Sequence, residues 1–425
     1  MKATVSASNI QGEIGAIASK SVAHRYLIAA ALSDREVFVG CHSVSEDILA
    51  TVNCLNAMGA DIIRKDGGFF VTPIDRNKIT DTKRQLPCNE SGSTIRFLIP
   101  VVAALGINGE FLKKGSLVSR PLKPLDEEME KKGAPLREKE GGIVAVEGKM
   151  NPGIFTLPGN VSSQYITGLL FALPMLDEDS EIRITTPLQS EDYVKITLDT
   201  LKAFQISVIY ENNCFYIKGK QVYTINSEPN VEGDWSNAAF FMTGAAIGKS
   251  EITYSNLNGE SLQGDKAVVD ILRRMGAHIE VQGDAYHVKG DKLTATRIDA
   301  KPIPDLVPIL ALAASVAEGE TVIYNAERLR IKESDRLKTV YETLTALGAD
   351  VEEKEAELVI RGKEKLKGGM VSSFNDHRIA MMAAIASIVC NEEVVIMQAE
   401  AVNKSYPGFY EDLKKLGAIV TIDEE

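Results

Sequence analysis

The chain has 425 residues, a formal net charge of −12 and 44% hydrophobic residues. This length is sufficient for two lobes with separate cores, and the acidic charge argues against nonspecific binding to nucleic acid. Residues 1–20 lack the apolar segment of a signal peptide, and the five cysteines include no Cys-x-x-Cys pair. The five histidines show no metal-ligand spacing. We therefore expect a cytoplasmic protein with free thiols and no metal site.

The sequence repeats six times with a period of about 71 residues. One marker is a helix-end phrase, most often containing Gly-Ala, that leads into a strand. It recurs at positions 59, 133, 205, 276, 348 and 417. The second marker is a short polar phrase before an Ala-rich helix, at positions 21, 93, 163, 236, 305 and 377. Because both markers keep one phase, we expect six copies of one structural unit.

The repeat at residues 265–330 shows the predicted elements most clearly. Apolar residues at helical spacing predict a helix over 265–275, which Gly276 would end in a left-handed conformation. Alternation then predicts strands over 278–281 and 286–288, joined by a hairpin turn.

The second helix of each repeat is apolar on all sides, as over 306–317 and 379–390. Such a helix is buried, and about 12 residues are too few to span a bilayer. A strand over 321–324 follows, and the linking segment should supply one more. We therefore predict an α/β fold with internal helices and external sheets.

Six units divide into three and three, and a Gly at position 233 offers a hinge. The N-terminal strand before Gly12 has no helix of its own and would complete the other lobe. We expect one lobe to comprise residues 1–18 and 233–425, and the other residues 19–232.

The starts of the buried helices are expected to meet a polar ligand, because helix N-termini bind anions. Eight basic residues lie at or near these starts or in short loops: Lys20, Arg25, Arg96, Arg120, Lys332, Arg336, Arg378 and Lys404. A single basic residue is usually solvated surface, but Arg96 and Arg378 adjoin apolar helix residues and should be buried with partners. Arginine donates in pairs to carboxylate and phosphate. The pattern indicates one small polyanionic substrate.

Six motifs carry a resemblance to a known family. They are Lys20-Ser21-x-x-x-Arg25, Gly92-Ser93-x-x-Arg96, Ser119-Arg120-Pro121-Leu122, Ser162-Ser163-Gln164-Tyr165, Ile331-Lys332-Glu333-Ser334-Asp335-Arg336-Leu337 and Asn375-Asp376-His377-Arg378-Ile379-Ala380-Met381. With them the chain resembles the 5-enolpyruvylshikimate-3-phosphate synthase family of enolpyruvyl transferases over essentially its whole length. The resemblance implies a two-lobed inside-out α/β barrel of six βαβαββ repeats with a two-strand hinge.

The resemblance also implies an activity in the shikimate pathway. The 5-hydroxyl of shikimate 3-phosphate adds to C2 of phosphoenolpyruvate while C3 is protonated; phosphate then leaves and C3 loses a proton. No metal or organic cofactor is implied, glyphosate is an expected inhibitor, and a monomer is expected. The lobes should close on shikimate 3-phosphate, which an unchanged radius of gyration in solution scattering would contradict.

Four residues match the family's catalytic positions. Asp305 matches the base that takes the 5-hydroxyl proton, although it could instead, or in addition, cap the following helix. Glu333 and Lys20 match residues that move the proton at C3, and Lys404 matches a lysine at the same centre. Glu333 could equally form a surface ion pair of little energetic value. A lysine in a closed cationic cleft should have a lowered pKa.

The resemblance assigns two overlapping binding sets. The phosphoenolpyruvate set is Lys20, Gly92, Arg120, Gln164, Arg336, Arg378 and Lys404. The shikimate 3-phosphate set is Lys20, Ser21, Arg25, Ser162, Ser163, Gln164, Ser190, Tyr193, Asp305 and Lys332. Gly92 could be a simple turn residue, and any one serine could be a helix cap, although the serines recur at one point of successive repeats.

Three positions depart from better-known members of the family. Glu90 and Arg328 stand where many members have Asn, and Glu191-Asp192 replaces Lys-Pro before Tyr193. These departures put the affinities and the inhibitor response in doubt.

Three other functions are alternatives for this sequence. UDP-N-acetylglucosamine enolpyruvyl transferases share the fold, but they usually carry a Cys in a loop that here, at residues 112–122, has none. They also open with Lys-Asn where this chain has Lys20-Ser21. A non-catalytic phospho-ligand binding protein is a further alternative, although every matched catalytic position is filled. Buried helices and clustered basic residues argue against a repeat scaffold for protein partners.

Overall fold

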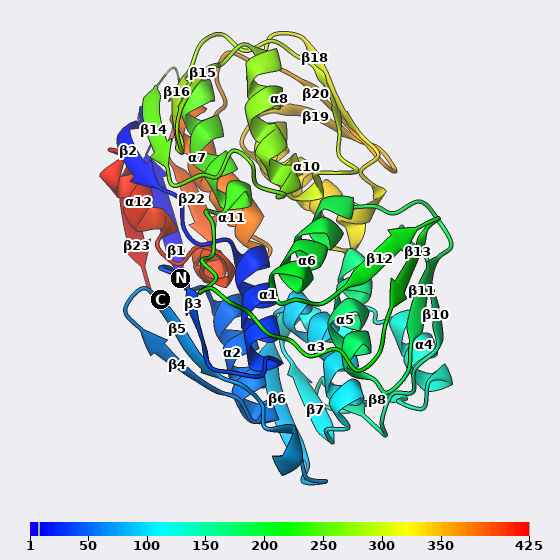
Figure 1. Cartoon of the computed structure of the whole chain (residues 1–425). Coiled ribbons are helices and arrows are strands. Elements are labelled where there is room, and N and C mark those ends of the chain that lie inside the picture. Colours follow the sequence, from blue (N-terminus) through cyan, green and yellow to red (C-terminus); the bar gives the residue numbers. More distant parts are fainter. Residues whose placement is uncertain (7–8, 249, 425) are drawn as a thin grey trace. The chain divides into compact units, whose positions relative to one another are not determined.

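The computed structural model describes residues 1–6, 9–248 and 250–424 (Figure 1). The chain forms two compact units: unit 1 is Met1–Ile17 with Glu232–Glu425, and unit 2 is Ala18–Val231. The chain therefore passes between the units twice. The expected lobe of residues 1–18 and 233–425 includes residues 7, 8, 249 and 425, which lie outside the described residues.

Unit 1 has a core of three buried helices. These are α7 (Trp235–Gly248), α9 (Val307–Ala314) and α11 (His377–Ala386), which contact one another. Every residue of α9 and α11 is buried, so the prediction of internal helices is confirmed. Burial on all sides follows from their composition, since an apolar helix surface is stable only when it is removed from water.

Three four-stranded sheets belong to unit 1. Their strand orders are β21 (Gly369–Ser372), β22 (Val394–Met397), β1 (Lys2–Ser6), β23 (Ile419–Asp423); β15 (His278–Gln282), β16 (Ala285–Lys289), β14 (Glu251–Ser255), β2 (Gln11–Gly15); and β17 (Arg297–Asp299), β18 (Glu320–Tyr324), β20 (Leu358–Arg361), β19 (Asp350–Glu353). β1 pairs antiparallel with β22 and β23, and β2 pairs parallel with β14. The first two strands therefore complete unit 1.

Partly buried helices complete each repeat of unit 1. They are α8 (Val268–Met275), α10 (Arg336–Ala346) and α12 (Phe409–Lys415). In α8 the buried residues are Val268, Val269, Ile271, Leu272 and Met275. This spacing places them on one helix face, as predicted for the helix over 265–275, whose first turn is the 3₁₀ helix η4 (Gly264–Ala267).

Unit 2 has the same two kinds of helix. The buried helices are α1 (Lys20–Ala31), α3 (Gly92–Leu105) and α5 (Ser163–Ala172), and the others are α2 (Glu46–Met58), α4 (Leu125–Lys131) and α6 (Glu191–Ala203). Helices α3 and α5 approach closely because Gly168 has no side chain. A Cβ there would lie 2.4 Å from the Arg96 carbonyl oxygen.

The sheets of unit 2 depart from strict repetition. Two have four strands: β6 (Arg84–Asn89), β7 (Gly109–Lys113), β9 (Ile143–Val146), β8 (Leu136–Lys139); and β10 (Ile154–Leu157), β11 (Ser180–Ile184), β13 (Cys214–Ile217), β12 (Val208–Glu211). The third has only β3 (Val37–Gly40), β5 (Gly68–Thr72) and β4 (Asp61–Lys65). Its linking strand is reduced to parallel bridges at Ser33–Tyr223 and Gly40–Asn230. Pro229, which has no N–H, lies in this segment and favours the interruption.

The repeat markers have a common backbone conformation. Gly276 has φ of 112°, and Gly59, Gly133, Gly348 and Gly417 are also left-handed. Gln205, at the one marker position without glycine, adopts φ of 60°. The left-handed conformation is therefore kept at Gln205, although this position lacks the glycine that favours it.

Two buried helices end earlier than predicted. The α-helix α9 ends at Ala314 rather than at 317, and α11 ends at Ala386 rather than at 390. The Ser315 hydroxyl donates to the Leu312 carbonyl, and the Ser387 hydroxyl donates to the Ala384 carbonyl. These side-chain bonds compete with the regular helical pattern and favour a tighter last turn.

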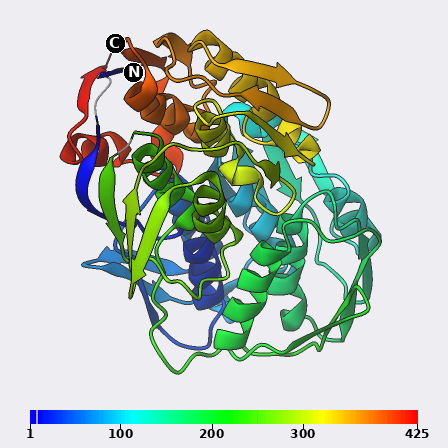
Figure 2. The same cartoon turned by 90° about the horizontal axis from the view of Figure 1, so that it is seen from above.

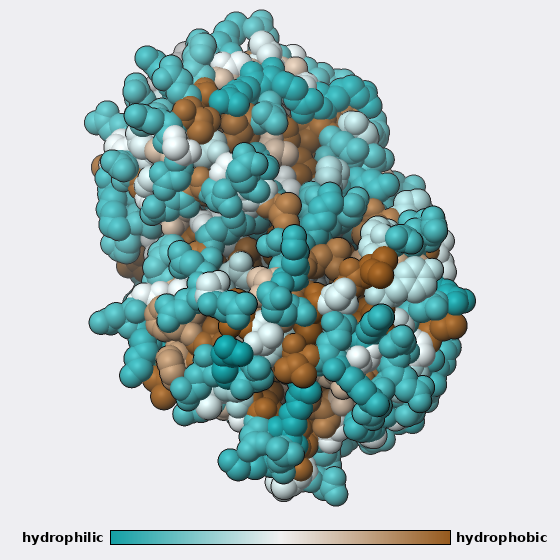
Figure 3. All heavy atoms as spheres, viewed as in Figure 1, coloured by the Kyte–Doolittle hydropathy of each residue, from teal (hydrophilic) through white to brown (hydrophobic). Residues whose placement is uncertain are grey.

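The views in Figures 1 and 2 show strands on the outside of each unit and helices within it. Hydrophilic side chains cover most of the face in Figure 3. No helix in the described residues combines the length and apolar character needed to cross a membrane. All five cysteines lie in the described part of the chain, and each is buried and free.

Candidate functional site

The predicted residues fall into one set per unit. Unit 1 holds Asp305, Lys332, Glu333, Arg336, Arg378 and Lys404; unit 2 holds Lys20, Ser21, Arg25, Gly92, Arg120, Ser162, Ser163, Gln164, Ser190 and Tyr193. Within each set, residues far apart in sequence come together.

Asp305 lies among cations at the start of α9, in the 3₁₀ helix η5 (Pro304–Leu306). Its Oδ1 accepts from Arg336 Nη1 at 2.7 Å and from Lys332 Nζ at 3.2 Å. Arg378 Nη2 lies 3.5 Å from Oδ2. The carboxylate of Asp305 therefore faces the cations.

The cations determine the charge of Asp305. Burial opposes ionisation of this carboxyl, but Arg378, Lys332 and Arg336 outweigh that effect and hold its pKa well below the ordinary value. The group is therefore ionised at neutral pH. It would become a stronger base if an anionic ligand drew these cations away.

Arg336 is a buried cation that pairs with three carboxylates. Its side chain is 1% exposed, and its Nε donates to Asp376 Oδ2 at 2.8 Å. Its Nη2 donates to Glu333 Oε2 at 2.7 Å and to Asp376 Oδ1 at 3.2 Å. The carboxylates raise the pKa of Arg336 despite its burial. Glu333 thus pairs with a buried arginine rather than with a surface residue.

Asp376 is an important contact that the sequence did not assign. It is fully buried, caps α11 and accepts from the Arg378 backbone N at 3.0 Å. One carboxylate therefore fixes Arg336 by its side chain and Arg378 by its backbone. An aspartate immediately before the predicted helix was a possible cap signal.

The charged groups around Asp305 change the pKa of Lys332. Burial lowers its pKa, and Arg336 and Arg328 lower it further against the opposing effect of Asp305 and Glu333. Lys332 follows the 3₁₀ helix η6 (Glu327–Ile331), and its side chain is 18% exposed. A lysine with this environment gives up its proton more readily.

Lys404 is held by an unusual loop. It ends the 3₁₀ helix η8 (Ala399–Lys404), and its Nζ donates to the Asn375 carbonyl at 2.6 Å. Phe374 and Asn375 have φ of 52° and 54°, a conformation that costs roughly 1–3 kcal/mol per residue. The Ser373 hydroxyl secures this loop by accepting from Asn375 N and donating to the Gln398 carbonyl. Such strain is commonly retained at functional sites.

Lys20 begins α1 in unit 2. Its Nζ donates to Asp47 Oδ2 at 2.8 Å, and the two side chains are 16% and 14% exposed. Asp47 lies in the first turn of α2, where a negative charge stabilises a helix. Sequence reasoning did not single out Asp47, because an acidic residue at a helix start is common.

Arg25 binds protein groups more than was expected. Its Nε donates to Thr197 Oγ1, and its Nη atoms donate to the Ser21 and Tyr193 carbonyls and, at 3.5 Å, to Thr167 Oγ1. Burial lowers its pKa to about 9. Its contacts join α1 to α6 and hold the backbone of two other predicted residues, Ser21 and Tyr193.

Arg96 sets the orientation of Gln164. Arg96 Nη1 donates to Gln164 Oε1 at 2.8 Å, and Gln164 Nε2 donates to Ser93 Oγ at 2.9 Å. Because a guanidinium only donates, the amide oxygen must face Arg96. Arg96 is 5% exposed, so the expectation that it is buried with a partner is confirmed.

Gly92 allows Arg120 to approach the start of α3. A Cβ on Gly92 would lie 2.8 Å from Arg120 Nη1 and 3.0 Å from Arg96 Nη1. Two guanidinium groups therefore flank the space beside this glycine. Its backbone is not left-handed, so the close approach explains the glycine better than a turn does.

The predicted serines differ in their local roles. Ser162 caps α5 by accepting from Gln164 N, so it has the structural role of a helix cap. Ser190 precedes α6 with φ of 53° and is 5% exposed. A left-handed serine is strained, and such strain is commonly retained at functional sites. Ser190 is therefore a stronger candidate for a functional role than Ser162, which caps a helix.

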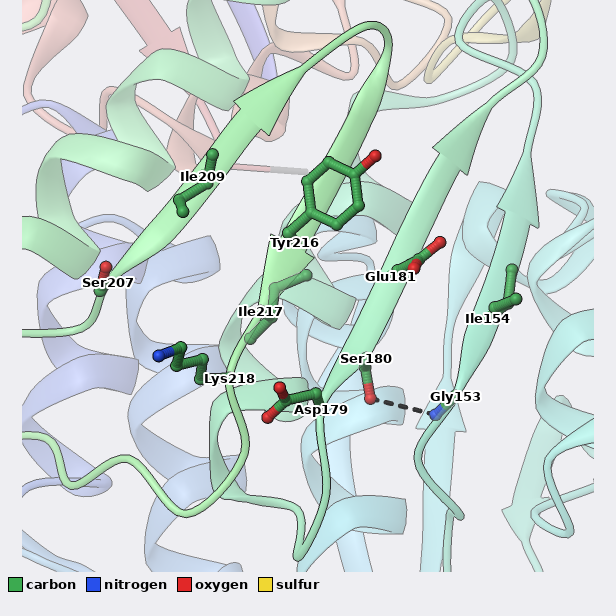
Figure 4. Close-up of a pocket in the computed structure, with 10 residues that line it drawn as sticks. All are labelled: Gly153, Ile154, Asp179, Ser180, Glu181, Ser207, Ile209, Tyr216, Ile217 and Lys218. Atoms are coloured by element: carbon green, nitrogen blue, oxygen red, sulfur yellow. Dashed lines mark hydrogen bonds between the residues drawn. The ribbon is translucent and has the colours of Figure 1, made fainter.

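A groove of about 280 Å³ lies on a sheet of unit 2 (Figure 4), and none of the predicted residues lines it. Its lining includes Ile154, Glu181, Ile209, Tyr216 and Lys218. The groove is on the exposed face of β10–β13, and it contains no constellation of catalytic groups.

Comparisons with known proteins identify the family. The family model for EPSP synthase (3-phosphoshikimate 1-carboxyvinyltransferase) matches residues 5–413. The chain belongs to this family. It therefore has 3-phosphoshikimate 1-carboxyvinyltransferase activity (EC 2.5.1.19), a transferase reaction of the shikimate pathway and of aromatic amino acid biosynthesis.

Individual relatives of the EPSP synthase family cover 97% or more of the chain. The 3-phosphoshikimate 1-carboxyvinyltransferase of Clostridium novyi is 46% identical over 97% of both chains. That of Clostridium kluyveri is 44% identical over 99% of this chain and 98% of its own. A solved EPSP synthase from Acinetobacter baumannii is 26% identical over 99% of this chain and 100% of its own, with a TM-score of 0.81. The predicted inside-out α/β fold is confirmed.

Two departures from better-known EPSP synthases lie near predicted residues. Arg328 is close enough to Lys332 to lower its pKa. The Glu90 carboxyl lies against Gly115, where a Cβ would be 2.4 Å from its carbon. Arg328 therefore alters the charge of the Asp305 cluster, whereas Glu90 packs against the loop between β7 and Arg120.

Proposed function

We propose that the chain transfers the enolpyruvyl group of phosphoenolpyruvate to the 5-hydroxyl of shikimate 3-phosphate, in the cytoplasm and as a monomer. Both substrates are small polyanions, in keeping with the predicted ligand. The observation that carries the assignment of roles is the ionised Asp305 held by Lys332, Arg336 and Arg378. It combines a proton acceptor with groups that bind carboxylate and phosphate.

The addition step uses Asp305 as the base. Its carboxylate takes the proton of the 5-hydroxyl as that oxygen bonds to C2 of phosphoenolpyruvate, and a proton is added at C3. Glu333 and Lys20 are the proposed donors at C3, and Lys404 acts at the same centre. The product of addition is a tetrahedral phosphoketal. In the elimination step the C2–O bond to phosphate breaks, C3 loses a proton, and the enolpyruvyl ether remains.

Substrate binding would activate Asp305. In the described structure its pKa is held low by three cations, so its affinity for a proton is weak. Substrate phosphate or carboxylate would compete for those cations and raise the pKa of Asp305 towards a useful value. The base is therefore activated mainly when the substrates are in place.

Two sets of residues would hold phosphoenolpyruvate. We assign Arg336, Arg378 and Lys404 of unit 1, and Lys20, Gly92, Arg120 and Gln164 of unit 2. Their positions are supported by fixed partners: Asp376 for Arg336, the Asn375 carbonyl for Lys404 and Arg96 for Gln164. Preorganised donors of this kind bind developing charge without reorganisation.

Shikimate 3-phosphate would bind a second set. We assign it Lys20, Ser21, Arg25, Ser162, Ser163, Gln164, Ser190, Tyr193, Asp305 and Lys332. The contribution of Arg25 is chiefly to hold the Ser21 and Tyr193 backbones, since most of its donors are occupied. Glyphosate is proposed to compete with phosphoenolpyruvate beside Gly92.

The test is phosphate release from the purified chain with phosphoenolpyruvate and either shikimate 3-phosphate or UDP-N-acetylglucosamine. Release with shikimate 3-phosphate alone supports the proposal. Release with only the nucleotide sugar would support the other class of enolpyruvyl transferase. If neither acceptor gives release although both substrates of the proposal bind, a non-catalytic binding protein is supported.

A further inference from the structure

A buried hydrogen-bonded chain connects Asp265, Ser236 and Arg378 in unit 1. The Ser236 hydroxyl donates a hydrogen bond to Asp265 Oδ2. The same hydroxyl accepts from Arg378 Nη2 at 2.8 Å. The three residues are 5%, 8% and 5% exposed, respectively. They come from η4, α7 and α11, so the chain crosses three elements of the unit.

The chemistry of the groups fixes the direction of each hydrogen bond. A guanidinium has donors only, so Ser236 Oγ must accept from Arg378. An ionised carboxylate only accepts, so the single hydroxyl proton must point to Asp265. Because Asp265 holds the Ser236 proton on its own side, a lone pair of the Ser236 oxygen remains directed towards Arg378 and can accept its hydrogen bond.

The other Arg378 contacts lead to the proposed base. Its Nη1 donates to the Asp305 backbone carbonyl at 3.2 Å, and its Nη2 lies 3.5 Å from Asp305 Oδ2. Ser236 thus binds the same nitrogen that approaches the Asp305 carboxylate. A shift of this nitrogen would change both the guanidinium position and the charge around Asp305.

We infer that Asp265 and Ser236 are positioning residues that orient Arg378 for phosphoenolpyruvate. This inference rests on the proposed function of Arg378. Neither residue needs to touch the substrate, because Ser236 acts through Arg378 and Asp265 acts through Ser236. A buried carboxylate contributes little net stability by itself, and orientation of an arginine gives it a specific use.

The protonation state of Asp265 should change how firmly the hydrogen-bonded chain holds Arg378. Burial and the nearby Asp305 raise its pKa to about 6, with Asp234 acting in the same sense and with Arg378 and Ser236 opposing. A protonated carboxyl can donate its own proton to Ser236. The hydroxyl would then lose its fixed direction towards Asp265, and Arg378 would be held less firmly.

The experiment compares KM for each substrate and the thermal unfolding midpoint in the full chain, using Ser236→Ala, Asp265→Asn and both together. Ser387→Ala is the matched control, because it removes a buried hydroxyl at the other end of α11 that donates to the Ala384 carbonyl. We expect Ser236→Ala to raise the KM for phosphoenolpyruvate about tenfold, the effect of one charge-assisted hydrogen bond. The KM for shikimate 3-phosphate should change less than about twofold, and Ser236→Thr should restore most of the loss.

Two further readouts separate positioning from general stability. The double variant should cost no more than the worse single variant, because Asp265 acts through Ser236. The KM ratio of Asp265→Asn to the unsubstituted chain should fall towards one as the pH drops from about 8 to about 5. This ratio removes the titration of the substrates themselves.

The outcomes distinguish the inference from the proposed function. If Arg378→Ala leaves both KM values and kcat unchanged, the role of Arg378 and the positioning inference are both overturned. If Arg378→Ala is impaired but Ser236→Ala behaves like the Ser387→Ala control, only the positioning inference is overturned. Equal losses for both substrates, additive losses in the double variant or a KM ratio independent of pH would also overturn it.

Discussion

The two units hold their cations in different ways. In unit 1, Arg336 contacts three carboxylates, those of Asp305, Glu333 and Asp376. In unit 2, Arg25 and Arg96 contact hydroxyls, carbonyls and an amide, and Lys20 pairs with Asp47. Arg336 therefore has charged partners that can exchange protons, whereas the partners described for Arg25 and Arg96 are neutral dipoles.

This difference indicates a division of labour. Coupled acids and bases allow a site to change protonation during a reaction. Neutral dipoles instead fix arginines without cancelling their positive charge, which suits binding of an anion. We therefore expect unit 1 to dominate the pH dependence and unit 2 to contribute chiefly to substrate position.

The largest expected effect concerns stability. Arg336→Met would leave buried carboxylates without their partner and should cost about 3–5 kcal/mol. Arg25→Met, the matched change in unit 2, should cost about 1–3 kcal/mol because it leaves neutral acceptors unpaired. Urea unfolding followed by hydrogen exchange in α10 and α1 would measure each loss in its own unit. An equal or greater loss for Arg25→Met would remove the contrast.

A smaller effect is expected at Gly92. Gly92→Ala would place a Cβ within 2.8 Å of Arg120 Nη1 and force that side chain to move. The KM for phosphoenolpyruvate should rise several-fold, roughly 3–10 times, as for loss of one interaction with a charged group. The inhibition constant of glyphosate should rise more. Parallel measurement of both constants is decisive, and equal losses would contradict the steric explanation.

The smallest expected effect is electrostatic. Arg328→Asn removes a cation that lowers the pKa of Lys332, so this pKa should rise by less than about one unit. The alkaline limb of the kcat/KM profile should move to higher pH by the same amount. The exposed Arg274→Asn is the matched control for a lost positive charge, and equal shifts in both variants would count against a local effect.

Arg328→Asn should also change how the stability of the chain depends on pH. The folded-state pKa of Lys332 lies below its ordinary value, so protonation of this lysine opposes folding. Stability should therefore rise with pH as the folded lysine loses its proton. In Arg328→Asn this rise should be smaller and should occur at higher pH. Urea midpoints between about pH 7 and pH 11 measure it.

Much of the fold was predictable because the sequence repeats its hydrophobic pattern. The two markers located all six buried helices, and the apolar composition of segments such as 306–317 predicted their burial. The missing linking strand near Tyr223 was not predictable from the period, because a single interruption depends on local pairing at Gly40 and Asn230. The helix ends at Ser315 and Ser387 depended on individual hydroxyl bonds.

The sequence singled out the cations of the candidate site but not their partners. Arginines and lysines stood out in an acidic chain, whereas Asp47 and Asp265 were acidic residues among many, and Asp376 stood in a motif without an assigned role. Asp376 lies 40 residues from Arg336, and Ser236 lies 142 residues from Arg378. The period placed Ser236 and Arg378 at the starts of two buried helices, but only the folded chain shows that their side chains are in contact.

The most direct test of the account is the Asp305→Asn variant, measured for turnover and for binding of both substrates. We expect kcat to fall roughly 10²–10⁴-fold, the usual contribution of a general base. Binding of shikimate 3-phosphate should persist, and Asp284→Asn, in an exposed hairpin turn, should be unaffected. Undiminished turnover by Asp305→Asn would contradict the claim that the carboxylate of unit 1 accepts the proton of the 5-hydroxyl.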